Sequence, residues 1–133
     1  ETTTRLTKPI GVAVDERGVI YVADGTLKRI FGFAPSGDIV LAIGHDGELA
    51  NPSGLAVDRV HQRLWVADAA KHQVTSYSTV DGSRLSTIGE RGSEPGEFNF
   101  PTNLAVEKTI TLGTRLFTKE NVDKGGEAIP ATK

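Results

Sequence analysis

The sequence contains no cysteine, no methionine and no long apolar run. Without cysteine there is no disulfide and no thiolate metal site, and the redox compartment stays undecided. No hydrophobic stretch approaches the roughly 20 residues that a membrane-spanning helix needs, so we expect no membrane partner. Because methionine is absent and the chain begins at Glu1, we expect a processed or excised piece.

An excess of charge of either sign is also missing. The chain has 15 Lys and Arg against 17 Asp and Glu, a formal net charge of −2. Binding to a phosphate backbone needs clustered Lys and Arg, so we expect no nucleic-acid partner. Hydrophobic residues make up 38% and charged residues 24%, which indicates an ordinary globular domain and not a disordered chain.

One unit recurs along the chain. The segment PIGVAVD, which begins at Pro9, returns as PSGLAVD at Pro52 and as PTNLAVE at Pro101. The copies begin 43 and 49 residues apart, a period typical of repeat architectures. We therefore divide the chain into an N-terminal strand or tail over 1–8, a first unit over 9–51, a second over 52–100, an incomplete third over 101–118 and a C-terminal tail over 119–133.

Each full unit predicts four short strands joined by tight turns. In residues 9–51, Gly or Pro interrupts every stretch long enough for a helix. Segments rich in Val, Ile, Tyr and Phe lie between these breaks. The predicted strands are 10–15, 19–24, 29–34 and 39–44 in the first unit, and 53–58, 63–68, 73–79 and 84–89 in the second. The strand over 73–79 is more polar than its counterpart, which favours a place nearer the outside.

The pattern of apolar and small residues predicts how these sheets stack. Residues 19–23 (VIYVA) are apolar on both faces, which indicates a sheet with a layer on each side. Gly11 and Ala13, like Gly54 and Ala56, predict a first strand at the crowded inner edge where sheets converge. We predict an all-β fold of β-propeller blades, each a four-stranded antiparallel meander.

These residues closely resemble the NHL repeat, which joins a Pro-x-Gly-Val-Ala-Val-Asp strand, a Gly turn, a Tyr-Val-Ala-Asp strand and an Arg-led third strand. The resemblance covers about residues 9–107 and implies a β-propeller, typically six-bladed, with the first strand innermost. The sequence departs from the pattern at Leu27 and Lys71, where the family has Asn, and at Gln73, where it has Arg. The matching residues are Pro9, Gly11, Asp15, Gly18, Tyr21, Val22, Ala23, Asp24, Arg29 and Phe33, then Pro52, Gly54, Asp58, Trp65, Val66, Ala67, Asp68 and Tyr77.

Two and a third blades are too few for a closed ring, which takes about 4–8. Head-to-tail association closes a ring when the rotation allows it, so three copies of two blades would make six. We therefore expect the partial propeller to be completed by oligomerisation, with a trimer as the first expectation and the third unit at or across the junction. The alternative is a fragment of a longer propeller, paired through its exposed edges.

The turns between second and third strands share one end of the meander with the links between units. This predicts one rim formed by 25–28, 44–51, 69–72 and 90–99, and function in propellers usually lies on such loops. We expect a protein partner there, whose identity the sequence leaves open. The candidate interaction residues are Lys28, His45, Asp46, Glu48, Lys71, His72, Glu90 and Arg91.

Asp24 and Asp68 end the second strand of each unit, and Arg29 and Gln73 follow five residues later. One interpretation is a ligand or metal rim. The other is a carboxylate that caps the turn through backbone N–H groups or through Arg29. Presence in both units favours the structural role, and the same reasoning assigns the aromatic position shared by Tyr21 and Trp65 to packing between blades.

Residues for catalysis or metal binding are sparse. The histidines show no His-x-x-His spacing, so we expect no zinc site within one chain, although a metal shared on a ring axis stays open. Relatives with lyase or lactonase activity place metal ligands at the mouths of the inner strands, where this chain has Ile10, Ser53 and Thr102-Asn103. We therefore predict a non-catalytic protein-interaction scaffold without cofactor, with two alternatives: a metal-dependent lyase or hydrolase, or a fragment without independent function.

Overall fold

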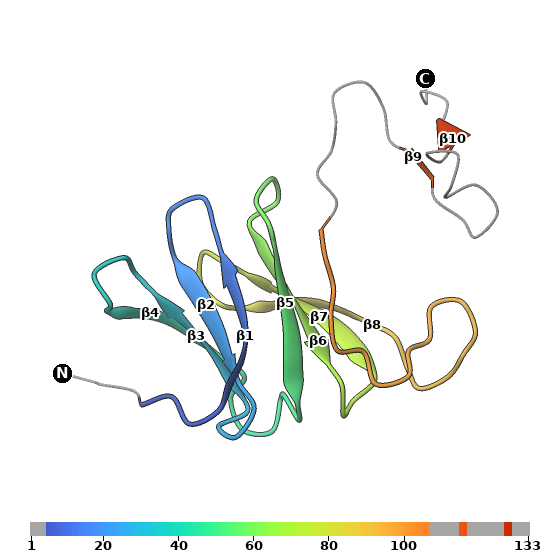
Figure 1. The fold of residues 1–133 in the computed structure, drawn as a ribbon, viewed down its shortest axis with the longest axis horizontal. Helices are drawn as coiled ribbons and strands as arrows, with labels where there is room; N and C mark the ends of the chain where they lie inside the picture. The colour runs from blue at the N-terminus through green and yellow to red at the C-terminus, as the bar shows by residue number, and fades with distance from the viewer. Residues whose placement is uncertain (1–4, 107–114, 117–126, 129–133) are drawn as a thin grey trace.

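The computed structural model describes residues 5–106, 115–116 and 127–128 (Figure 1). Predictions for the N-terminal threonines, for most of the third unit after Val106 and for most of the tail lie outside these residues. Within the described part, no helix is long and apolar enough to cross a membrane.

Eight strands form two four-stranded antiparallel sheets, each with its strands in chain order (Figure 1). All eight begin and end within one residue of the predicted positions, and the predicted all-β fold of meander blades is confirmed. Blade 1 consists of β1 (Pro9–Val14), β2 (Ile20–Asp24), β3 (Arg29–Phe33) and β4 (Ile39–Ile43). Blade 2 consists of β5 (Pro52–Asp58), β6 (Arg63–Asp68), β7 (Gln73–Ser78) and β8 (Arg84–Ile88).

The two blades meet at their first strands, β1 and β5, which lie side by side (Figure 1). A Cβ atom on Gly11 would lie 2.7 Å from the carbonyl oxygen of Ser53, closer than real Cβ contacts come. Only glycine allows β5 to approach β1 so closely. The prediction that the small first strand occupies the converging edge of the sheets is therefore confirmed.

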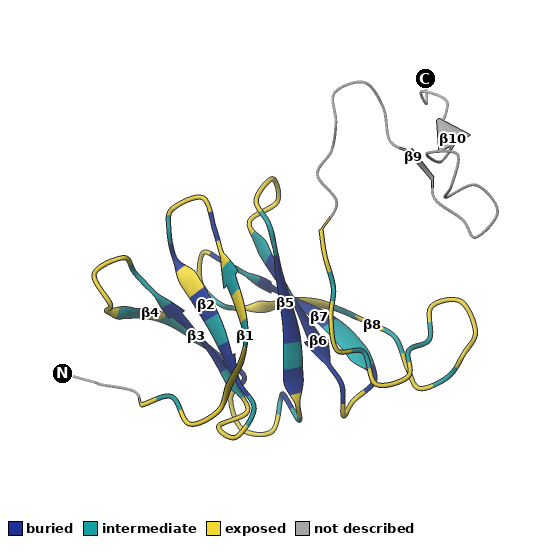
Figure 2. Cartoon of the chain, viewed as in Figure 1, coloured by how far each residue is buried: buried dark blue, intermediate teal, exposed yellow. Residues whose placement is uncertain are grey.

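The hydrophobic core lies between the blades, where Figure 2 shows the buried residues of both sheets. Each fully buried side chain of this size contributes roughly 1.5–3 kcal/mol relative to exposure. Blade packing, and not propensity alone, therefore holds the meanders together. The cluster consists of Val19, Tyr21, Ala23, Ile30, Ile43, Leu49, Leu55, Leu64, Val66 and Tyr77.

The polar sequence of β7 does not place it at the surface, so that expectation is wrong. Thr75 and Ser76 are buried. Their hydroxyls lie 3.2 Å from Oγ1 of Thr87 and 2.6 Å from Oγ of Ser86 on β8. Buried polar atoms are tolerated when they are hydrogen-bonded, and these hydroxyl pairs satisfy one another.

The third unit begins in the place of a next innermost strand, although 101–106 forms no strand. The Ser53 hydroxyl lies 3.1 Å from the carbonyl oxygen of Pro101. A Cβ atom on Gly54 would lie 3.0 Å from the carbonyl oxygen of Thr102, as one on Gly11 would meet that of Ser53. Further on, β9 (Arg115–Leu116) pairs with β10 (Glu127–Ala128), which joins the predicted third unit to the predicted tail.

Candidate functional site

The structure brings the predicted rim residues of both blades together around the link between the blades. The guanidinium of Arg29 lies 3.5 Å from Nδ1 of His45. From the other side, Nζ of Lys71 donates to the carbonyl oxygens of Gly47 (3.1 Å) and Glu48 (2.6 Å). The link 44–51 is therefore tied to blade 2 by Lys71, while its histidine lies beside the first residue of β3.

Most of the candidate rim residues present their side chains to solvent, and two do not. His72 exposes only 9% of its surface. Glu48 is half-buried and acts on Tyr77: burial first, and the Glu48 carboxylate second, raise the pKa of that phenol well above its usual value. The exposed members are Lys28, His45, Asp46, Lys71, Glu90 and Arg91, so the surface that a partner would meet carries both signs of charge.

Asp24 is fully buried and serves the fold. One carboxylate oxygen accepts the N–H groups of Thr26 (3.0 Å) and Leu27 (2.9 Å) in the following turn. The other accepts those of Thr7 (2.6 Å) and Lys8 (3.0 Å) in the segment before β1. Burial alone would raise the pKa of Asp24, but these four donors outweigh it and hold the pKa below 3.8.

Asp68 holds the equivalent position in blade 2 and also accepts hydrogen bonds from backbone N–H groups. Its carboxylate accepts the N–H groups of Ala50 (2.8 Å), Asn51 (3.0 Å) and Lys71 (3.2 Å). Each repeat aspartate thus fastens the link that enters its blade to the turn that follows β2 or β6. Arg29 and Gln73 face these aspartates as partners in the strand ladder.

A hydrogen-bonded network at the opposite end of blade 1 was not predicted. The buried Asp15 carboxylate accepts the N–H groups of Arg17 (2.8 Å) and Val19 (3.0 Å) and the Tyr21 hydroxyl (2.8 Å). Nη2 of Arg17 lies 2.8 Å from that carboxylate and also donates to the carbonyl oxygen of Thr79 in blade 2 (3.0 Å). Arg17 therefore links the two blades.

This network shifts the pKa values of Asp15 and Tyr21. Burial would raise the pKa of Asp15, but the hydrogen bonds from Arg17 and Tyr21 outweigh it and lower the pKa below 3.8. Burial and the bond to Asp15 raise the pKa of Tyr21 to about 12. The repeat comparison could not find this role of Tyr21, because blade 2 has Trp65 at the same position.

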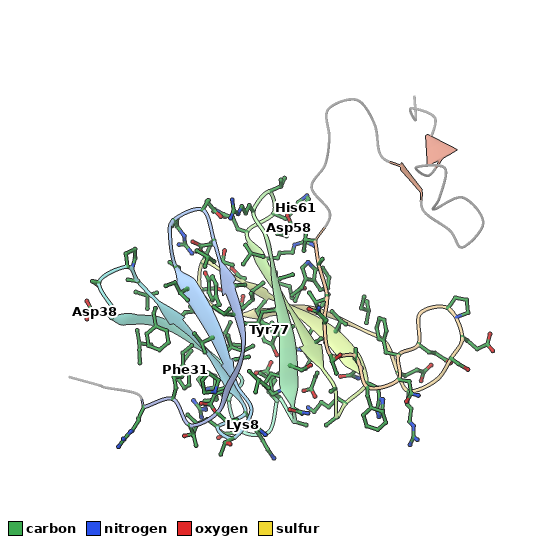
Figure 3. The ribbon with its side chains drawn as sticks, viewed as in Figure 1. Lys8, Phe31, Asp38, Asp58, His61 and Tyr77 are labelled. Atoms are coloured by element: carbon green, nitrogen blue, oxygen red, sulfur yellow. The ribbon has the colours of Figure 1, made fainter. Side chains whose placement is uncertain are left out.

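Blade 2 ends in a simpler pair at this end of the molecule. Nδ1 of His61 lies 2.8 Å from the carboxylate of Asp58, the counterpart of Asp15. Figure 3 shows the two side by side at the turn between β5 and β6, at the opposite end from Lys8, with Tyr77 between the blades. Among the described residues, no three His, Asp or Glu side chains gather as metal ligands.

The outer face of blade 1 carries exposed apolar side chains, as expected where a chain of too few blades leaves its terminal sheets without a neighbour. Val12 exposes 64% of its surface, whereas Leu55 at the same position of blade 2 exposes 8%. Ile20 exposes 39%, whereas its counterpart Leu64 exposes none. Figure 2 shows exposed residues along β1 and β2 beside the buried ones. The face that blade 2 buries against blade 1 therefore has no second sheet over it in blade 1, within the part of the chain that the structure describes.

The outer face of blade 2 is the second free face. Ile43 exposes 1% of its surface in the core between the blades, whereas its counterpart Ile88 exposes 51%. Trp65 is half-buried where Tyr21 is fully buried. Among the described residues of the third unit, Thr102 and Asn103 cover the inner edge of this face at Gly54.

No protein-family model matches the chain. Solved structures share its fold. The match to hydrazine synthase of Kuenenia stuttgartiensis has a TM-score of 0.62 and 12% sequence identity, and it covers 79% of this chain and 28% of the hydrazine synthase chain. The match to apo AztD of Citrobacter koseri has a TM-score of 0.57 and 16% identity, and it covers 74% of this chain and 26% of AztD. The match to U3-55K has a TM-score of 0.55 and 15% identity, and it covers 64% of this chain and 27% of U3-55K. The chain thus spans about a quarter of each, and it is a partial β-propeller segment of two blades.

Proposed function

We propose that the chain is an NHL-type β-propeller segment that acts as a non-catalytic protein-interaction scaffold. The observation that carries this proposal is the open face of blade 1, where Val12 and Ile20 are exposed although their repeat counterparts are buried. Contiguous apolar surface of this kind marks a place where another protein surface binds. The exposed, mixed-charge rim gives a second surface on which a partner protein can be selected.

The open faces at the two ends of the chain suit each other. On its outer face, blade 2 has Trp65 and Ile88 at the positions with which blade 1 contacts blade 2, namely Tyr21 and Ile43. On its own outer face, blade 1 has Val12 at the position with which blade 2 contacts blade 1, namely Leu55. A second copy can therefore repeat the contact between the blades. We propose that such head-to-tail contacts close a ring of three copies, which would carry six blades.

This ring has one structural requirement. The first strand of the next copy would lie over Gly54, where Thr102 and Asn103 now lie. The start of the third unit must therefore leave β5 as the ring closes. The segment 101–106 forms no strand of its own, so the ring exchanges the contacts of this short segment for those of a whole apolar face.

Trp65 tests the proposal because it is the only tryptophan of the chain and lies on the free face of blade 2. In the ring it is buried by the next copy, so its emission lies at shorter wavelength than in a monomer. Val12→Glu puts a charge on the open face of blade 1 and should shift the emission to longer wavelength. Val60→Glu, at an exposed valine of the turn between β5 and β6, is the matched control and should emit as the wild type does.

The outcomes separate the possible contacts. Equal emission from the wild type and Val12→Glu, with a mass above one chain, would show that copies meet through another surface and would overturn the head-to-tail ring. Equal emission with the mass of one chain in both would overturn self-association altogether.

A further inference from the structure

Besides the Ser53 hydroxyl, a histidine of blade 2 contacts the start of the third unit. The backbone N–H of Phe100 donates to Nδ1 of His72 over 3.0 Å, and the two rings meet edge to face at 4.4 Å between centroids. His72 belongs to the turn between β6 and β7 and is buried. The contact therefore ties a blade turn to the segment that leads to Pro101.

This hydrogen bond sets the protonation state of the ring. A backbone N–H can only donate, so Nδ1 of His72 must carry a free lone pair and the ring proton must lie on Nε2. A second proton would go to Nδ1 and place two donors against each other. The bond is thus compatible only with neutral His72, and histidine gains its second proton between about pH 8 and 5.

The segment held in this way is conformationally strained. Phe100 has a φ of 51°, in the left-handed region that is unfavourable for a bulky residue. Such a conformation persists only where the surroundings hold it. When the bond to His72 is lost, relaxation of Phe100 favours departure of the segment.

The charged side chains near His72 come from Arg91 and Lys71. The guanidinium of Arg91 lies 6.0 Å from the centroid of the Phe100 ring, so a charged His72 and Arg91 would both lie beside that ring. Lys71 precedes His72, and its ammonium binds the carbonyl oxygens of Gly47 and Glu48. No described carboxylate forms an ion pair with His72.

The histidine is not part of the repeat. Its counterpart in blade 1 is Lys28, and both residues have a φ of 55°. The carbonyl oxygen of Lys28 lies near Gly44, and that of His72 lies near Gly89, the equivalent glycine of blade 2. A lysine side chain cannot accept a hydrogen bond. Blade 1 thus makes the same turn without this contact, which shows that the blade fold does not require it.

We propose that His72 is a proton-controlled latch that holds residues 98–106 on blade 2 when neutral and releases them when protonated. Release uncovers the inner edge of the free face of blade 2 at Gly54. Because the proposed ring needs that edge, acid should strengthen self-association; this consequence rests on the proposed function, whereas the latch itself does not.

The latch is tested by NMR of the isotope-labelled full chain with Val12→Glu as the common background, which keeps the protein as one chain. At about pH 8 the His72 ring should carry its proton on Nε2, and the Phe100 amide should be protected from hydrogen exchange. Once His72 titrates, the protection factor of Phe100 should fall by about tenfold per pH unit. The amides in the ladder between β5 and β6 should keep their protection over the same range.

Two variants complete the test. In His72→Asn the amide oxygen replaces Nδ1 as acceptor, carries no titratable charge and tolerates a positive φ, so Phe100 should stay protected at both pH values. His45→Asn, an exposed rim histidine, should keep the pH dependence of the background protein. A pH-independent protection factor in the background protein, or equal losses there and in His72→Asn, would overturn the latch. If His72→Asn does not fold, the tautomer of His72 in the background protein decides, and a proton on Nδ1 at about pH 8 would overturn it.

Discussion

Val12 and Leu55 hold the same position in successive blades, yet Val12 exposes 64% of its surface and Leu55 only 8%. The sequence around them is almost identical, so the difference arises from what lies next to each sheet. Leu55 packs into the core against blade 1, and no described residue covers Val12 in the same way. The open apolar face of blade 1 is thus a direct consequence of the number of blades in the chain.

Asn in place of Asp24 should destabilise the fold strongly. The buried carboxylate accepts four backbone N–H groups, and an amide that turns its own NH₂ toward two of them leaves donors unpaired. We expect Asp24→Asn to lower the free energy of unfolding by about 2–3 kcal/mol, measured by urea denaturation. Asp46→Asn, at an exposed position of the rim, is the matched control and should stay within about 0.5 kcal/mol. Equal values for the two variants would remove Asp24 from its structural role.

Acid should unfold the protein by protonating the same carboxylates. Burial opposes ionisation of Asp15 and Asp24, but their hydrogen bonds outweigh it and lower both pKa values below 3.8. Each group therefore stabilises the fold fully above the unfolded value and loses this contribution as the pH falls through the lower, folded value. The contribution of these two carboxylates to the free energy of unfolding should be constant down to about pH 4 and should then decrease. The wild type should lose more over this range than Asp24→Asn, and parallel curves would contradict the assignment.

Both tyrosines should resist ionisation while the chain is folded. Burial and the Asp15 carboxylate raise the pKa of Tyr21 to about 12, and burial and Glu48 raise that of Tyr77. The absorbance of tyrosinate should therefore stay low through about pH 11 in the native protein and rise near 10 in urea. Tyr21→Phe leaves Tyr77 as the only tyrosine and should not restore titration near the ordinary value. An early rise in the native wild type would show that a phenol is exposed.

Alanine in place of Gly11 should disturb the junction of the blades. Its Cβ would lie 2.7 Å from the carbonyl oxygen of Ser53, which belongs to β5 and cannot turn away. We expect a loss of about 1–3 kcal/mol in the free energy of unfolding. Gly25→Ala is the control, because its Cβ would meet only the flexible end of Ile10 at 3.1 Å. If Gly25→Ala costs as much, the general effect of replacing a glycine, and not the contact between the blades, would explain the loss at Gly11.

The strands could be predicted from the sequence because their signals are local. Breaks at residues such as Gly18 and Gly37 separate short β-rich segments, and the repeat shows each segment twice. The polarity of 73–79 does not predict the burial of this strand, because its hydroxyls form pairs with the neighbouring strand, such as Ser76 with Ser86. Such pairs cannot be read from one strand alone.

The candidate site was predictable only in outline. The predicted topology places the rim loops at one end of the blades. The side chains of Glu48 and His72 are nevertheless at least half-buried, because they lie beside Tyr77 and Phe100, which are distant in the sequence. Arg17 reaches Thr79 across 62 residues, and nothing in the local sequence of either predicts that contact. The open face of blade 1 was predictable from the blade count, because two blades are too few to close a ring and leave their outer faces without a neighbouring sheet.

The absolute mass in solution tests the central claim most directly. Light scattering on a sizing column, over a wide dilution series near neutral pH, should give three times the chain mass of 14.2 kDa for the wild type and for Val60→Glu. Val12→Glu should give the mass of one chain, because a charge on the open face opposes its burial. A wild type that has the mass of one chain, or a mass that Val12→Glu leaves unchanged, would contradict a ring closed through the open face of blade 1.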